Sequence, residues 1–141
     1  MKILSIHFAH DSNISYLNKG KILENLNEER FSRNKMHVGW PSDSLKWLFK
    51  KYNLSYDNFD KIVIINDINK KNFEEPFNSI EGYYKLLKIT KPNYIGIISK
   101  IINLLDYLFP FFKIKYFILK KLFLNFLIKN KINLNKVEFV D

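Results

Sequence analysis

Three short apolar runs lie within the first 26 residues and are separated by short polar turns. This arrangement is typical of antiparallel strands. The runs at residues 2–8, 14–17 and 22–26 have the length and composition of buried strands. Residues 9–12 form a polar turn, and Asn18-Lys19-Gly20-Lys21 is a hairpin turn in which Gly20 can take a positive φ. The sequence therefore predicts a three-stranded antiparallel meander.

A helix and a fourth strand follow the meander. Residues 27–35 are charged and are expected to form a loop, and the Gly-Trp-Pro at residues 39–41 breaks the chain. Ser42 is the expected N-cap of the helix, with Asp43 near its positive end. One apolar helical face recurs at the spacing i, i+3, i+4, i+7, on Leu45, Leu48, Phe49 and Tyr52. Residues 61–65 are a buried strand, expected beside the first, and the whole is an α/β pattern.

The second half of the chain is mostly helical by pattern. Residues 66–93 are polar and are expected to be irregular, whereas residues 94–109 and 111–128 are expected to be helices separated by Pro110. Residues 136–140 form a last strand candidate. With 141 residues the chain is long enough for one domain, and its 47% apolar content excludes global disorder.

Much of the net charge of +9 lies in the helical part. Residues 100–131 contain seven lysines and one acid, Asp106. A spanning helix needs ~20 mostly apolar residues, and each central lysine would cost ~3 kcal/mol, so a membrane-spanning role is disfavoured. Three interpretations stay open: a helical insertion packed on the domain, a helical surface on anionic membranes from which lysines snorkel, and a nucleic-acid surface. The last ranks lowest, because arginine-rich and aromatic-ladder motifs are lacking.

Cysteine chemistry is excluded, because the chain contains no cysteine. Disulfides, thiolate nucleophiles and Cys-ligated zinc are therefore ruled out. This composition is consistent with the reducing cytoplasm, which is the expected location. His7, His10 and Asp11 interrupt the first apolar run, so a signal peptide is not expected.

All three histidines and both arginines fall within the first forty residues. Arg30 and Arg33 stand three residues apart in a chain with 21 lysines, and a guanidinium offers a planar fork for carboxylate or phosphate. The alternative is that these arginines only pair with Glu28 and Glu29 on a solvated surface. The turn at His10 can present backbone amides, a carboxylate and a hydroxyl to an anion, and a histidine can act as a general base. The alternative there is a solvated turn.

Taken together, these motifs are more specific. The chain reads His10-Asp11-Ser12, then a hairpin, then N-E-E-R-F-S-R-N-K over residues 27–35, then G-W-P and a helix. This succession resembles the start of the NodU/CmcH-type carbamoyltransferases, and the ending K-V-E-F-V-D resembles the strand before that family's V-D-H-H-x-x-H-A motif. The sequence departs from the family pattern at the hairpin turn, at Asn27 in place of an acid, and at Met36 in place of a histidine, with His37 one position late.

The resemblance implies the first half of an actin/sugar-kinase/Hsp70-like (ribonuclease H-like) domain. The chain would be a single partial domain: a strand, helix and strand core at residues 1–65, a variable and mostly helical insertion at 66–131, and a final strand at 132–141. A separate C-terminal domain, absent from this chain, makes carbamoyl-adenylate from carbamoyl phosphate and ATP in this family. The family's divalent metal, often iron, is held by histidines of an H-x-x-x-H motif and a distant Asp, so no metal ligand is expected here. The chain is therefore expected to be a fragment that is inactive alone.

The implied function is transfer of the carbamoyl group to a hydroxyl of a sugar or natural-product acceptor. By resemblance, His10 is the catalytic candidate beside the acceptor hydroxyl, and Lys35 neutralises the developing oxyanion or a donor phosphate. Asp11 and Ser12 would shape the loop around donor or metal, and Arg30 would brace the site. His10 and Lys35 are expected to face one cleft. The competing interpretation is a non-enzymatic basic protein that binds anionic membranes through residues 94–128.

Overall fold

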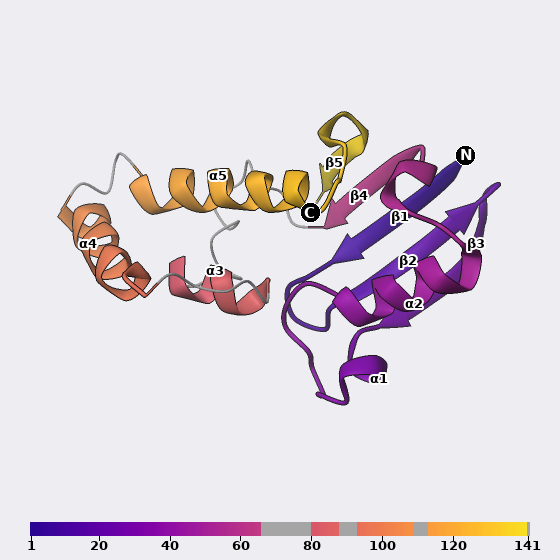
Figure 1. The fold of residues 1–141 in the computed structure, drawn as a ribbon, viewed down its shortest axis with the longest axis horizontal. Coiled ribbons are helices and arrows are strands. Elements are labelled where there is room, and N and C mark those ends of the chain that lie inside the picture. Colours follow the sequence, from indigo (N-terminus) through magenta and orange to yellow (C-terminus); the bar gives the residue numbers. More distant parts are fainter. Residues whose placement is uncertain (66–79, 88–92, 109–112, 141) are drawn as a thin grey trace.

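A computed structural model describes residues 1–65, 80–87, 93–108 and 113–140. Its centre is one five-stranded sheet in the order β3-β2-β1-β4-β5 (Figure 1). Antiparallel pairing joins β1 to β2 and β2 to β3, whereas β4 runs parallel to β1 and β5 parallel to β4. The strands are β1 (Lys2–His7), β2 (Asn13–Asn18), β3 (Lys21–Asn27), β4 (Lys61–Ile65) and β5 (Val137–Val140).

The predicted meander and the predicted fourth strand are confirmed, and the α/β class with them. The hairpin between β2 and β3 turns through Lys19 and Gly20, both at positive φ (50° and 77°). The fourth strand lies beside the first, with Ile6 opposite Ile64. The order of the strands follows from the sequence, because two short turns can only give antiparallel neighbours, while a crossover through a helix returns the chain parallel.

One face of the sheet forms the core. The side chains that point to it from β1, β2 and β4 are fully or almost fully buried: Leu4, Ile6, Ile14, Tyr16, Ile62 and Ile64. Helix α2 (Ser42–Tyr52) covers part of this face with buried Leu45 and Leu48, and the Tyr52 ring contacts Tyr16 edge-on. The predicted apolar face of this helix is therefore confirmed. On β1, Ile3 and Ser5 alternate with the buried residues Leu4 and Ile6 and are only half-buried.

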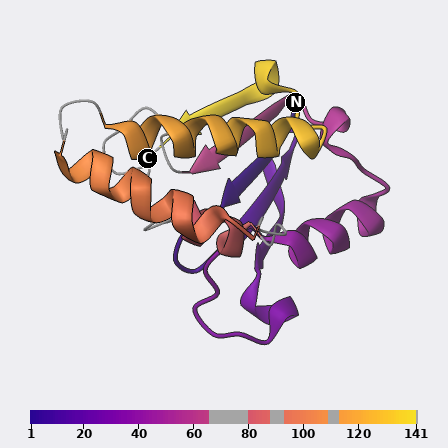
Figure 2. The same ribbon diagram turned by 60° about the vertical axis from the view of Figure 1, so that its left-hand side comes forward.

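Helix α5 (Ile114–Lys129) covers the same face nearer the carboxyl end of β1. The Phe123 ring is fully buried and stacks on Phe8, with their centroids 5.0 Å apart, and it meets Trp40 edge-on at 6.3 Å. Phe126 adds a second edge-on contact with Trp40. Two elements far apart in sequence are thereby held together by aromatic packing. In Figure 2, α4 (Ile95–Leu108) runs beside α5 and away from the strands.

Three expectations about local structure are corrected. The expected loop at residues 27–35 contains a short helix, α1 (Glu29–Ser32), and the expected irregular stretch at residues 66–93 contains α3 (Ile80–Leu86). Ser42 is the first helical residue and not the N-cap, a position that Pro41 holds.

The remaining expectations about the second half are met where they can be compared. The two predicted helices are α4 and α5, and the final strand is β5. Pro110, expected between the helices, and residues 66–79 lie outside the described residues. Among the described helices, none has both the length and the apolar character needed to cross a membrane.

Replacing Phe123 by Ala should destabilise the protein strongly. The change removes a ring buried against Phe8 and Trp40, and such core truncations cost about 3–5 kcal/mol. The matched control is Phe117→Ala on the same helix, where the ring is 63% exposed, with an expected cost within about 0.5 kcal/mol. Urea unfolding of the two variants measures the difference. Similar losses in both would mean that α5 does not pack on the sheet as described.

A surface contact between β3 and α2 should make stability depend on pH. Glu24 accepts hydrogen bonds from Lys51 Nζ and from the Tyr52 hydroxyl, and these bonds, that of Lys51 first, hold the pKa of Glu24 below its usual value. A lowered folded-state pKa stabilises the fold above the unfolded-state pKa, and this stabilisation is lost as the pH falls through the folded-state value. Glu24→Gln should therefore lower the melting temperature near neutral pH and have no effect in strong acid. An effect that is independent of pH would contradict this.

Candidate functional site

The turn after β1 brings a histidine and a carboxylate together. The His10 Nδ1–H donates to Asp11 Oδ2 at 2.7 Å, and both side chains are more than half exposed. Asp11 has a positive φ of 57°, a left-handed conformation that reverses the chain toward β2. The Asn13 side-chain amide donates to the Asp11 carbonyl oxygen at 3.1 Å. The turn is therefore folded on itself, with the Nε2 edge of His10 remaining for other partners.

The loop before α2 is bound to this turn through its backbone. The Ser12 N–H donates to the His37 carbonyl oxygen at 2.9 Å, and the Gly39 N–H donates to the Phe8 carbonyl oxygen at 3.0 Å. Gly39 has φ of 135°, a conformation that side chains rarely allow. These bonds place residues 37–39 alongside residues 8–12. They explain how two motifs separated by a hairpin meet at the carboxyl end of β1.

Glu28 joins the turn to helix α2. Its backbone N–H donates to the Ser12 carbonyl oxygen at 2.9 Å, and its fully buried carboxylate accepts three bonds at the start of α2. These come from the Asp43 N–H (3.0 Å), the Ser44 N–H (2.9 Å) and the Ser44 hydroxyl (2.6 Å). A carboxylate at a helix N-terminus satisfies free N–H groups and the positive end of the dipole. This is the cap that the sequence had assigned to Ser42.

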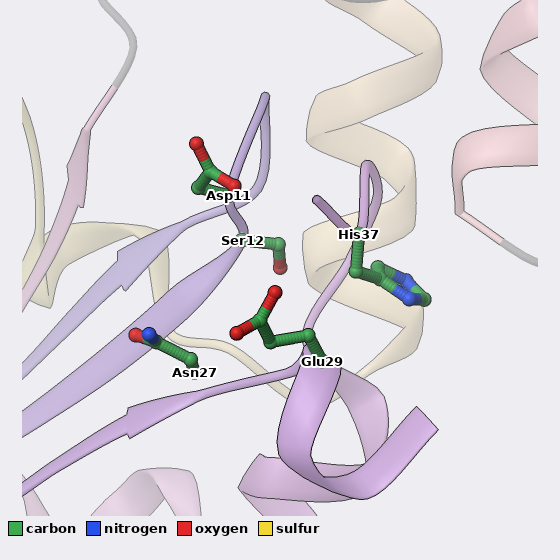
Figure 3. Close-up of a pocket in the computed structure, with 5 residues that line it drawn as sticks. All are labelled: Asp11, Ser12, Asn27, Glu29 and His37. Atoms are coloured by element: carbon green, nitrogen blue, oxygen red, sulfur yellow. The ribbon is translucent and has the colours of Figure 1, made fainter. Parts of the chain in front are cut away.

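A small pocket of about 70 Å³ opens between the turn and α1. Its lining is shown in Figure 3 and consists of Asp11, Ser12, Asn27, Glu29 and His37. The Ser12 hydroxyl is buried and has no hydrogen-bond partner among the described residues; in Figure 3 it points toward the Glu29 carboxylate. The buried His37 ring shares a hydrogen bond with the Ser32 hydroxyl through Nδ1 (2.9 Å), whereas its Nε2 has no partner within the part of the chain that the structure describes. Buried polar atoms without partners are uncommon and mark places where a ligand can bind.

The pocket is rich in hydrogen-bond acceptors. Asp11 and Glu29 bring two carboxylates, and the five described residues of the lining include no lysine or arginine. One Glu29 oxygen also accepts the Met36 N–H at 3.2 Å, which holds the carboxylate in place. A group with several N–H or O–H donors matches this lining, and a bare phosphate does not, because two carboxylates would repel it.

The expected site residues divide into two sets. Asp11 and Ser12 line the pocket, and His10 lies at its border through its bond to Asp11. Lys35 and Arg30 are both exposed; they lie on the loop and on α1, and neither is among the pocket-lining residues. The shared cleft of His10 and Lys35 therefore stays a prediction.

Three pocket residues, and the capping role of Glu28, were missed from the sequence. Asn27 and Glu29 belong to the N-E-E-R-F-S-R motif, which was the available signal for them. For His37 the only signal was that it stands one position after the place of the family's histidine. The alternative in which Glu28 pairs with arginines on a solvated surface is wrong, because its carboxylate is buried at the α2 N-terminus. Among the described residues, no group of three or more His, Asp or Glu side chains is placed to hold a metal ion.

The fold and the site together define an α/β domain with a polar pocket at the carboxyl end of its central strand. The sequence model of the carbamoyltransferase N-terminus family matches residues 2–139, which is nearly the whole chain. The chain therefore belongs to the carbamoyltransferase family and corresponds to its N-terminal region. No curated protein matches it significantly.

Removing the Glu28 carboxylate should destabilise the fold more than removing a surface carboxylate. Glu28→Ala removes the acceptor of two backbone N–H groups and leaves the Ser44 hydroxyl with only its longer bond to the Pro41 carbonyl oxygen (3.3 Å), at a cost of about 3 kcal/mol. Glu28→Gln should lose less because one oxygen remains. Glu138→Ala is the control, since Glu138 forms only an exposed ion pair with Lys61, and it should cost at most about 1 kcal/mol. Equal losses in Glu28→Ala and Glu138→Ala, measured by urea unfolding, would contradict the capping role.

Proposed function

We propose that this chain is the N-terminal part of the acceptor domain of a NodU/CmcH-type carbamoyltransferase. The reaction is transfer of a carbamoyl group from carbamoyl-adenylate to a hydroxyl of a sugar or natural-product acceptor. The family match over residues 2–139 supports the reaction class. The observation that carries the assignment of the site is the His10–Asp11 pair at the end of β1, beside a pocket that contains an unpartnered buried hydroxyl.

The sheet supports the wider fold that we propose. Three antiparallel strands followed by two parallel ones, in the order β3-β2-β1-β4-β5, fit the first half of an actin/sugar-kinase/Hsp70-like, ribonuclease H-like domain. Under this proposal the helices between β4 and β5 are an insertion into that half. The acceptor domain then works with a second domain that makes carbamoyl-adenylate from carbamoyl phosphate and ATP.

His10 is the proposed general base. Its Nδ1–H is bonded to Asp11 at 2.7 Å, which leaves Nε2 as the proton acceptor and lets the carboxylate stabilise the imidazolium that forms. His10 Nε2 removes the proton of the acceptor hydroxyl while its oxygen attacks the carbamoyl carbon. The tetrahedral intermediate then breaks the bond between that carbon and the phosphate oxygen. AMP leaves, and the acceptor carries a new carbamate ester.

Lys35 and Arg30 are the proposed partners of negative charge. The ammonium of Lys35 would neutralise the oxyanion or the donor phosphate, and the Arg30 guanidinium would brace the loop. The pocket has the opposite character, because its described lining residues include two carboxylates and no lysine or arginine. It suits the N–H and O–H groups of the substrates. This sequence has no His-x-x-x-His, and its described residues do not form a metal site.

His10→Asn and Lys35→Ala should each lower carbamoyl transfer roughly a hundredfold, because losing one such contact costs ~3 kcal/mol in the transition state. The assay joins this chain to the C-terminal portion of a related full-length enzyme and measures acceptor carbamoylation. Formation of carbamoyl-adenylate, measured separately, should be unchanged. Lys50→Ala, an exposed lysine on the outer side of α2, is the control and should transfer normally.

Two outcomes would overturn these roles. Transfer at the unmutated rate in both variants would show that neither residue takes part in catalysis. Loss of carbamoyl-adenylate formation together with transfer would show that the residues are structural. The chain without the C-terminal portion is expected to show no transfer.

A further inference from the structure

Helix α4 has two apolar sides, and only one of them is covered. Ile95, Ser99 and Ile102 are buried and face the rest of the molecule. On the other side, large apolar residues recur at Ile97, Ile101, Leu104 and Leu108, and each is more than half exposed. This spacing of i, i+4, i+7, i+11 forms a straight stripe along a helix. Its neighbours on the same side are also exposed: Tyr94, Ile98 and Leu105.

The position of α4 leaves this stripe open. In Figures 1 and 2 the helix lies at the end of the molecule away from the sheet, with α3 and α5 on its inner side. Helices on the surface of a soluble protein normally carry polar residues outward, and contiguous exposed apolar surface marks an interaction site. The outer stripe of α4 therefore has the character of an interaction surface.

The excess of lysines in this part of the chain indicates what kind of surface the stripe would bind. Between residues 100 and 131 the chain has seven lysines and one acid, and that acid, Asp106, turns inward and accepts the Lys115 backbone N–H at 3.3 Å. Lys100 lies on α4 at the border of the stripe and is exposed, as are Lys113 and Lys121 on the neighbouring segment. The apolar stripe thus belongs to a lysine-rich part of the chain whose one acid, Asp106, is bonded to the neighbouring helix.

We propose that α4 lies in the surface of an anionic lipid bilayer, with its outer stripe in the acyl boundary and the lysines at the lipid phosphates. An apolar face bordered by lysines is the pattern of an interfacial helix. A second copy of this chain fits less well, because its residues 100–131 would bring the same excess of lysines toward the interface and like charges would meet. Since no described helix is long and apolar enough to span a membrane, the contact is peripheral.

The test is sedimentation of the chain with phosphatidylcholine vesicles that contain or lack phosphatidylserine. Binding should require phosphatidylserine and weaken as salt rises. The double variant Ile101→Gln/Leu104→Gln should lose about tenfold or more in affinity, since two buried aliphatic side chains are removed from the lipid. Lys100→Gln should lose about fivefold, the equivalent of about 1 kcal/mol for one lysine near an anionic surface. Ile22→Gln, at an isoleucine on β3 that is even more exposed than Ile101, is the control and should bind normally.

Melting temperatures of all variants establish that each is folded, and the α4 positions are exposed, so little change is expected. Equal binding to vesicles with and without phosphatidylserine would overturn the proposal, as would no binding to either. Lipid-independent dimers that the double variant abolishes would overturn it in favour of self-association. These outcomes are independent of carbamoyl transfer, so the proposed reaction stands or fails separately.

Discussion

The carboxylate of Glu28 is the contact on which the arrangement of the site depends. It is fully buried, yet it is satisfied by the N–H groups of Asp43 and Ser44 and by the Ser44 hydroxyl. Its backbone is bonded at the same time to Ser12. One residue therefore fixes both the start of α2 and the turn after β1. Burying a carboxylate is unfavourable unless all its partners are supplied, and here the free end of a helix supplies them.

The meander, α2, β4 and the broad helical character of residues 94–128 could be predicted because each depends on local pattern. Short apolar runs separated by turns specify β1 to β3, and the 3.6-residue period specifies α2. The four-residue α1 could not be found in this way, because so short a helix is held by its surroundings and not by propensity. The cap of α2 was predicted at Ser42 for a similar reason. The carboxylate that accepts the first N–H groups of α2 belongs to Glu28, which is remote in sequence, whereas capping rules consider only residues next to the helix.

The candidate site was predictable as a motif but not as a geometry. His10, Asp11 and Ser12 were selected from a single turn, and that turn indeed holds a bonded histidine–carboxylate pair. His37 reaches the pocket through a backbone bond from Ser12 to its carbonyl oxygen, which no spacing rule anticipates. The resulting lining has two carboxylates and no cation, while Lys35 and Arg30 lie on the adjacent segment. In the proposed reaction, the phosphate of carbamoyl-adenylate would therefore lie at the basic segment. The N–H and O–H groups of the molecule that receives the carbamoyl group would lie in the pocket.

The parallel pairing of β4 with β5 has a consequence for how the chain reaches its fold. Strands β1 to β3 meet through short turns, whereas β5 must find β4 across residues 66–136. Contacts between distant segments form late, because the loop between them must close first. The entropy of closing a loop grows only with the logarithm of its length, at about 0.6 kcal/mol for each doubling. The connection can therefore lengthen at little cost in loop closure, whereas α5, whose buried side chains pack on the sheet, cannot be lost without loss of stability. An accessory surface such as that of α4 can thus be added there without disturbing the pocket at the end of β1.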